Sequence, residues 1–301
     1  MLKRKPKPKL NGNTFFDWIN YVLMGVMAFI MLYPLWYCLV GSLNEGMDYL
    51  RGGVFFWPRK WSTASYRAVF LDSSIMNAFA VTIAKCVVGT VTSVLCTTMV
   101  AYAITRPVLR LKKYYIPFFM FTMFFGGGLI PFYLLIVDLK LYDTFWVYIL
   151  PSMFSAYNMI IIQSFVRDLP GELIESAKID GANEYRIFFQ MILPLSKPVL
   201  ATISLFSVVG HWNSYFDSMM YTNSPALQTI QLYLKKVITD PSMAKGLGTA
   251  AAATIPGQAL TLTPQVVKLA TMIVTALPVI CVYPFLQRYF VKGVTMGAVK
   301  G

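Results

Sequence analysis

Residues 18–44 read WINYVLMGVMAFIMLYPLWYCLVGSLN, an uncharged and mostly apolar run. A helix needs about 20 such residues to cross about 30 Å of hydrocarbon. The run is therefore long enough to span a membrane. Five further stretches have the same character, although one contains Lys85 and another contains Asp217. We predict an all-α integral membrane protein with six transmembrane helices, at about 18–43, 74–105, 114–137, 144–166, 198–222 and 268–288.

The composition supports this class of protein. Hydrophobic residues make up 57% of the chain and charged residues 13%, whereas a soluble domain carries about 25% charged residues. This excludes a single soluble domain, and the 15% aromatic content excludes a disordered chain. The net charge of +13 suits nucleic-acid binding or the positive-inside bias of membrane proteins, and the hydropathy favours the second. We therefore expect membrane lipid, and no nucleic acid, around this chain.

The distribution of lysine and arginine predicts the orientation. Residues 1–17 form a basic tail, and the apolar run after it is longer than the apolar part of a signal peptide, so we expect an uncleaved first helix. With this tail inside the cell, the inner segments hold most of the basic residues. We predict both termini to be cytoplasmic, in the plasma membrane, with residues 18–301 as one transmembrane domain. Its large outer loops are 45–73 and 223–267.

The largest predicted inner loop, from residue 167, reads RDLPGELIESAKIDGANEYRIFFQMILP. Pro170 suits the first turn of a helix, and Leu173, Ile174 and Ala177 would share an apolar face. Gly181 would stop that helix, because glycine adopts the left-handed conformation at little cost. We predict a helix–glycine–helix elbow over 170–194. Its charged side suits docking into a groove of a soluble partner or contact with lipid headgroups, and periodicity alone leaves both open.

The loop also resembles a known pattern. Glu175-Ser-Ala-Lys-Ile-Asp-Gly181, followed by Met191-Ile-Leu-Pro194, resembles the EAA loop of ABC-importer permeases, with Ser176 in place of an alanine and Met191 in place of an isoleucine. The segments GHWNSYFD at 210–217 and FLQRYFVKG at 285–293 are similar to the oligosaccharide branch of the carbohydrate-uptake permeases. The resemblance covers residues from about 70 to 301.

This resemblance implies the type I ABC importer permease fold and a set of partners. The partners would be a second permease chain, two cytoplasmic ATPase subunits and an extracytoplasmic substrate-binding protein. ATP and Mg²⁺ would be used by the ATPase, and this chain has no GxxxxGK[ST] phosphate loop. We therefore expect no cofactor and no enzyme activity on this chain. The elbow would be the coupling helix, with coupling residues Glu175, Ser176, Ala177, Lys178, Asp180, Gly181, Ala182, Glu184 and Pro194.

Ionisable residues inside a membrane are candidates for the substrate pathway. Lys85 could face a cavity and bind a sugar, or its stem could be buried with the amine on a nearby acceptor. Asp217 follows Trp212, Asn213 and Tyr215, and sugar sites combine aromatic faces with Asn and Asp side chains. The alternative for this second group is an aromatic belt at the membrane surface.

Other functions fit the sequence less well. The importer could carry amino acids, peptides or another polar solute instead of a sugar or oligosaccharide. A membrane-embedded enzyme would need a convergent catalytic pair, but His211 and Asp217 would face differently on one helix. We expect His211 to be a packed or hydrogen-bonding residue. A carrier that works without an ATPase would show inverted repeats, which the sequence does not display. The four cysteines lie in apolar runs without metal-binding spacing.

Overall fold

The computed structural model describes residues 14–254 and 262–298. Within these ranges every regular element is helical, apart from an isolated β-bridge between Asn44 and Trp61. This confirms the all-α class. Most of the basic tail and part of the predicted outer loop 223–267 lie outside the described residues. The chain forms two compact units, Met1–Val69 with Ala244–Ile273, and Phe70–Met243 with Val274–Gly301.

The smaller unit contains α1 (Thr14–Ser42) and α2 (Gly46–Leu50), the greater part of α3 (Ala64–Leu71) and of α14 (Pro241–Thr254), and the start of α15 (Pro264–Ala298). The candidate span in α1 has no buried residue in its most apolar part, although it is apolar on all sides. A helix of this kind is stable only where lipid or other apolar chains cover it. A helix that crosses the lipid bilayer meets this condition.

The loop after α1 is held by one buried carboxylate. Asp48 accepts hydrogen bonds from Nδ2 of Asn44 at 3.0 Å and from Nε of Arg59 at 3.1 Å. These bonds, with Asn44 the largest contributor, hold the pKa of Asp48 below its ordinary value. The segment predicted as a large polar outer loop is therefore an ordered structure built on α2 and α3.

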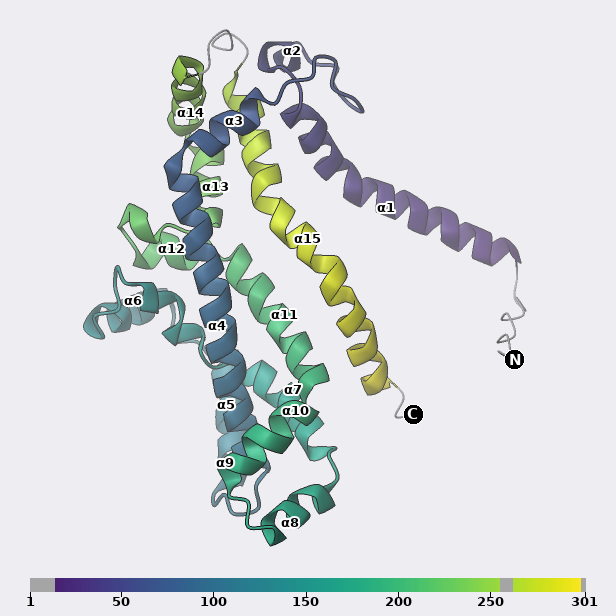
Figure 1. Cartoon of the computed structure of the whole chain (residues 1–301), viewed down its shortest axis with the longest axis vertical. Helices are drawn as coiled ribbons and strands as arrows, with labels where there is room; N and C mark the ends of the chain where they lie inside the picture. Colours follow the sequence, from purple (N-terminus) through teal and green to yellow (C-terminus); the bar gives the residue numbers. More distant parts are fainter. Residues whose placement is uncertain (1–13, 255–261, 299–301) are drawn as a thin grey trace. The chain divides into compact units, whose positions relative to one another are not determined.

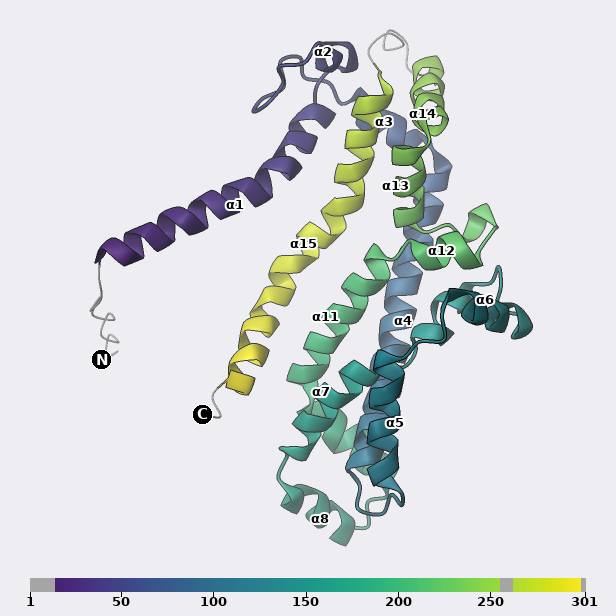
Figure 2. The same cartoon turned by 180° about the vertical axis from the view of Figure 1, so that it is seen from behind.

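The larger unit is organised around the long helix α4 (Ser73–Thr105). It runs beside α11 (Lys197–Asn213) and α7 (Ala156–Arg167), and α5 (Lys112–Phe124) packs on α7. Figures 1 and 2 show these helices together, with α8 (Gly171–Ile179) at one tip of the unit. The carboxylate of Asp72 caps the N-terminus of α4, accepting from the backbone N–H of Ser74 at 2.9 Å.

Small and hydroxyl side chains line the buried face of α4. They allow neighbouring helices to approach closely, as is common between membrane helices. At Gly89 the approach is close, because an added Cβ would lie 2.5 Å from Nε2 of His211 on α11. Buried small and hydroxyl residues of this face include Ala78, Thr82, Gly89, Thr90, Ser93, Thr97, Thr98 and Ala101, and Lys85 is buried among them.

Among the described residues, three helices are long and apolar enough to cross a membrane alone: Phe16–Ser42, Ser73–Thr105 and Pro264–Val282. Three bent helix pairs raise the number to six if each pair crosses as one span. They are Lys112–Phe124 with Leu129–Asp138 at 111°, Phe145–Ser152 with Ala156–Arg167 at 49°, and Glu184–Leu195 with Lys197–Asn213 at 79°. Six crossings are thus compatible with the structure.

Three of the predicted spans each contain more than one helix in the structure. The stretch 114–137 becomes α5 and α6 (Leu129–Asp138), separated by a glycine run that ends at Gly128 with φ +87°. The stretch 144–166 becomes the 3₁₀ helices η1 (Phe145–Tyr148) and η2 (Leu150–Ser152), then α7. The stretch 198–222 becomes α11 and α12 (Phe216–Tyr221), separated at the extended residue Ser214.

The remaining elements complete the larger unit. After α8 come α9 (Glu184–Ile187), the π-helix η3 (Phe188–Ile192) and α10 (Leu193–Leu195), which lead into α11. The 3₁₀ helix η4 (Pro225–Leu227) and α13 (Ile230–Thr239) follow α12, and both contact α4. The side chains of the C-terminal segment 285–293, which is similar to the permease branch, lie outside the described residues.

Candidate functional site

The elbow between α7 and α11 turns at a glycine with left-handed backbone. Gly181 has φ +75° and follows Asp180, the C-cap of α8. The N–H of Ala182 donates to the carbonyl of Ala177 at 2.9 Å, and the N–H of Gly181 donates to the carbonyl of Lys178 at 3.1 Å. These two bonds form a Schellman motif, which satisfies the last carbonyls of α8 and fixes the direction of the chain.

Two short apolar faces anchor the elbow to the helices above it. Ile174 and Ala177 of α8 are buried in one cluster with Ile187 and Phe188 of the following segment, and this cluster includes residues of α4, α7 and α11. Leu173 was expected on the same face but is 41% exposed. The buried face of α8 is therefore narrower than predicted, because a helix of nine residues places only one side against the core.

Glu184 connects the elbow to α4. Its Oε1 lies 2.8 Å from Nζ of Lys178, and its Oε2 accepts from the hydroxyl of Tyr102 at 2.5 Å. Burial acts to raise the pKa of Glu184, but the hydrogen bonds from Lys178 and Tyr102 outweigh it and leave the pKa below its ordinary value. The guanidinium of Arg106 lies 4.6 Å from the centre of the Tyr102 ring. The ionised carboxylate thus holds both halves of the elbow on the end of α4.

Most of the predicted coupling residues lie on the outer side of the elbow. Ala177 is buried and Ala182 is half-buried, as their packing in the elbow requires. Two apolar side chains that the sequence reasoning did not single out are also exposed, Ile179 at 85% and Tyr185 at 72%. Ile179 does not share the helical face of the buried residues Ile174 and Ala177, so its exposure could have been predicted from the sequence. The exposed predicted residues are Glu175, Ser176, Lys178, Asp180, Gly181, Glu184 and Pro194.

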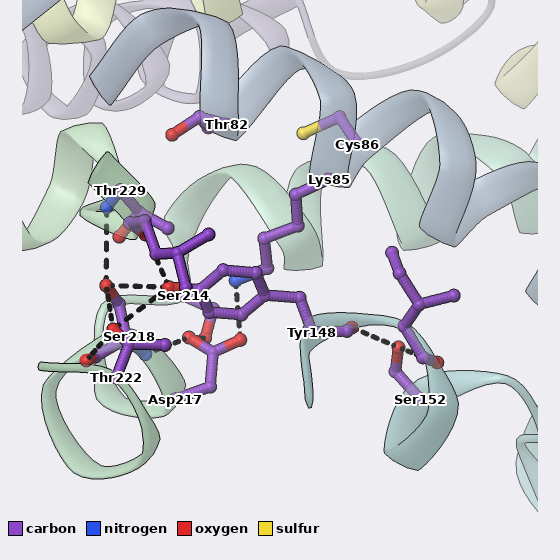
Figure 3. Close-up of polar contacts among 12 residues, drawn as sticks. Thr82, Lys85, Cys86, Tyr148, Ser152, Ser214, Asp217, Ser218, Thr222 and Thr229 are labelled. Carbon is purple, nitrogen blue, oxygen red and sulfur yellow. Dashed lines mark hydrogen bonds and ion pairs between the residues drawn. The ribbon is translucent and has the colours of Figure 1, made fainter. Parts of the chain in front are cut away.

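A second polar site lies at the break between α11 and α12 (Figure 3). Lys85 of α4 is completely buried, and its Nζ lies 2.5 Å from Oδ2 of Asp217. The other carboxylate oxygen of Asp217 accepts from the hydroxyl of Ser214 at 2.7 Å and from the N–H of Ser218 at 2.9 Å. The two ionisable residues that the sequence offered as separate pathway candidates therefore form one ion pair.

Tyr148 of η1 joins this ion pair to the chain beyond α12. Its ring centre lies 4.8 Å from Nζ of Lys85. Its hydroxyl donates to the carbonyl of Leu227 at 2.6 Å and lies 3.0 Å from the hydroxyl oxygen of Ser218. Ser218 in turn accepts from the N–H of Thr229 at 3.3 Å. With 18 tyrosines in the chain, the sequence carried no signal for Tyr148.

The cluster neutralises its own charges. An ammonium and a carboxylate in a low-dielectric site are stable only when paired and hydrogen-bonded, and both conditions are met here. In this conformation Lys85 is not exposed to any pathway. The arrangement favours the second alternative for Lys85, a buried stem with the amine on a nearby acceptor. The ion pair with Asp217 also holds α12 against α4.

Comparison with known proteins places the chain in a family. The model of the binding-protein-dependent transport system inner membrane component matches residues 11–296. The chain belongs to this family. Protein LplC of Bacillus subtilis (strain 168) is 35% identical over 286 residues, which cover 95% of each chain. The polygalacturonan/rhamnogalacturonan transport system permease protein YtcP of the same strain is 34% identical over 290 residues, covering 96% of this chain and 99% of YtcP.

A solved structure agrees with these relatives. A crystal structure of a bacterial ABC transporter involved in the import of the acidic polysaccharide alginate contains a chain that is 32% identical, with a TM-score of 0.84. The match covers 95% of this chain and 100% of that chain. These findings confirm the ABC-importer permease family that the EAA-like loop indicated. The chain is an inner-membrane transport component and not an enzyme.

Three further pathway candidates of this transport component have different surroundings. Trp212 is 7% exposed and its Nε1 donates to the carbonyl of Thr275 at 3.3 Å, so it packs between helices. Asn213 is exposed. Tyr215 is 38% exposed, and Nζ of Lys235 lies 4.5 Å from its ring centre. Of these candidates, Asn213 and Tyr215 are therefore the ones that a solute could reach in this conformation.

Within residues 14–254 and 262–298, no three His, Cys, Asp or Glu side chains gather closely enough to hold a metal ion. His211 is buried against Gly89, which agrees with the packing role expected for it. Its surroundings favour helix packing over proton transfer.

Proposed function

We propose that the chain is a permease subunit of an ATP-driven importer that moves a sugar or oligosaccharide across the membrane by alternating access. Its membership of the binding-protein-dependent family and the transport systems for which its relatives are named support this proposal. The same names favour a sugar cargo over amino acids or peptides. Relatives named for polygalacturonan/rhamnogalacturonan and for alginate make uronate oligosaccharides the first cargo to test.

The elbow over 170–194 would be the coupling helix, seated in a cleft of a cytoplasmic ATPase subunit. This assignment is supported by two sets of contacts that hold the elbow in place. The Schellman motif at Gly181 fixes its turn, and Glu184 fixes it to the end of α4. A rigid elbow of this kind can transmit a movement of its partner to α4, whereas a loosely held loop cannot.

The complete importer would contain a second permease chain, two ATPase subunits that use ATP and Mg²⁺, and an extracytoplasmic substrate-binding protein. ATP-driven closure of the ATPase pair would favour the outward-facing state, because each state binds the nucleotide differently. Both termini and the elbow would be cytoplasmic in the plasma membrane, and the segments 45–73 and 223–267 would face the binding protein. The excess of lysine and arginine on the proposed inner side supports this orientation.

Purification of the complex tests the proposal. The chain is co-expressed with the products of its neighbouring genes and recovered through an affinity tag. We expect a second permease-like chain and an ATPase in the eluate, and ATP hydrolysis in proteoliposomes that rises when a sugar-loaded binding protein is added. Recovery of a stable chain without any ATPase would contradict the importer proposal. Stimulation by an amino-acid or peptide receptor alone would overturn the sugar cargo.

A further inference from the structure

A groove next to the elbow lies where α4 ends. It has a volume of about 370 Å³ and runs between the last turns of α4, the segment after it and the start of η3. Its wall is mostly apolar, and it opens to the surface of the larger unit. The side chains that matter here are Met99, Ala103, Arg106, Val108, Leu109 and Phe188.

One basic side chain, Arg106, lines this groove, and the segment that follows it in the sequence is basic. Residues 99–113 contain Arg106, Arg110, Lys112 and Lys113 and no acidic residue. Nε of Arg106 is buried and has no hydrogen-bond partner within the described part of the chain. Glu184 is the acidic group that lines the groove, and its carboxylate is already occupied by Lys178 and Tyr102. Arg106 therefore places a guanidinium group with one unpaired N–H beside an apolar trough.

We propose that this groove binds an anionic phospholipid, with an acyl chain in the apolar trough and the phosphate on Arg106. Three features favour a lipid over a peptide or a nucleic acid. The groove lies at the end of a membrane-spanning helix, where headgroups are found. The trough is apolar, as acyl chains require, and Arg106 with the basic segment that follows it in the sequence carries the charge that attracts anionic lipid on the cytoplasmic leaflet.

This inference rests on the proposed function for one point, the cytoplasmic position of the end of α4. It adds a consequence for coupling. Tyr102 and Glu184 line the groove and also hold the elbow. A lipid seated there packs against the same side chains, so its presence stabilises the seat of the elbow. Transport by the complex should therefore increase with the anionic fraction of the membrane.

Photo-crosslinking in the purified complex tests the site. The complex is reconstituted in nanodiscs that contain a photoactivatable phosphatidylglycerol, and the labelled peptides are located by mass spectrometry. We expect labelling within 99–109 and 185–188. Arg106→Gln should reduce it about five-fold, the loss expected for one basic residue at a membrane surface. Ala103→Trp should abolish it by filling the trough, since Ala103 is exposed there.

Arg167→Gln is the matched control, because Arg167 is an exposed arginine at the end of α7 and does not line the groove. Its labelling should equal that of the unmodified chain. Equal labelling by a phosphatidylcholine probe, or labelling unchanged in both groove variants, would overturn the lipid site. Labelling of the isolated chain but not of the assembled complex would show that a protein partner covers the groove, which also overturns it. An absent ATPase would instead refute the proposed function while leaving the labelling measurable.

Discussion

Nζ of Lys85 lies 2.5 Å from Oδ2 of Asp217, and this ion pair connects α4 with the first turn of α12 across 132 residues of sequence. The two partners differ in their surroundings. Lys85 is completely buried, whereas the side chain of Asp217 is 23% exposed. Removal of either partner leaves a charge, but only the remaining aspartate can regain contact with water. The pair should therefore respond unequally to substitution.

Asp217→Asn should destabilise the chain more than Lys85→Met. Leaving one member of a buried pair without its partner costs about 3–5 kcal/mol, and the fully buried lysine should lie at the upper end. The double variant Lys85→Met/Asp217→Asn should lose less than the sum of the two single variants, because no unpaired charge remains. Thermal unfolding of the purified chain in detergent measures all three. Additive losses would show that the pair is not coupled.

Gly181→Leu should weaken ATPase docking without preventing insertion into the membrane. The left-handed backbone at φ +75° costs a residue with a side chain about 1–2 kcal/mol. An added Cβ meets no atom within 4 Å, so the effect comes from the turn itself and not from a clash. Gly181→Asn should be tolerated, since asparagine adopts this conformation more readily. Co-purification of the ATPase gives the readout.

Gly171→Leu is the control for that variant. Gly171 begins α8, its added Cβ also meets nothing, and its backbone is not left-handed. It should therefore retain the ATPase. If Gly181→Leu also retained the ATPase with normal transport, the elbow would not be the coupling element.

The ionisation of Glu184 should make the elbow sensitive to acid. Its pKa is lower in the folded chain than in the unfolded chain, because Lys178 and Tyr102 donate to the carboxylate. Its contribution to stability is therefore fully present above the unfolded value of about 4.3. The contribution is lost as the pH falls through the lower folded value. Glu184→Gln should remove this contribution at neutral pH and flatten the response below about pH 4.5.

Unfolding midpoints measured from pH 6.5 to pH 3.5 test the role of Glu184. Lys178→Met should weaken the pH dependence in part, because the bond from Tyr102 remains. Glu175→Gln is the matched control, since Glu175 is an exposed carboxylate on α8, the helix that carries Lys178. An equal flattening in this control would assign the acid sensitivity to the general charge of the elbow.

The local features of the chain could be predicted from the sequence. The apolar runs indicated the spans, and Pro170 and Gly181 marked the ends of α8, because helix boundaries depend on backbone preferences that act over a few residues. The breaks were harder. The glycine run before α6 permits a bend, but the angle of 111° between α5 and α6 depends on packing that no local pattern encodes.

The contacts between distant segments could not be predicted. Lys85 and Asp217 attracted attention because charges are rare inside membranes, yet nothing in their spacing showed that they pair. Trp212 was a candidate for either a sugar pathway or an aromatic belt, because a composition rich in aromatic residues does not show which side of a helix faces a cavity. The structure turns its indole toward α15 through Thr275. Periodicity predicts a buried face, and tertiary contacts decide what that face meets.

Gly89→Ala should disturb the packing of α4 on α11. The new Cβ would lie 2.5 Å from Nε2 and 2.8 Å from Cε1 of His211, and His211 is buried, so its ring has little room to move. Overpacking of this kind costs about 1–3 kcal/mol. Gly210→Ala is the control on the facing helix, because nothing lies within 4 Å of its added Cβ. That substitution should be neutral or slightly stabilising, since alanine favours helix. The double variant Gly89→Ala/His211→Ala should regain part of the loss, and a loss unchanged by removal of the ring would mean that other contacts limit the approach of the two helices.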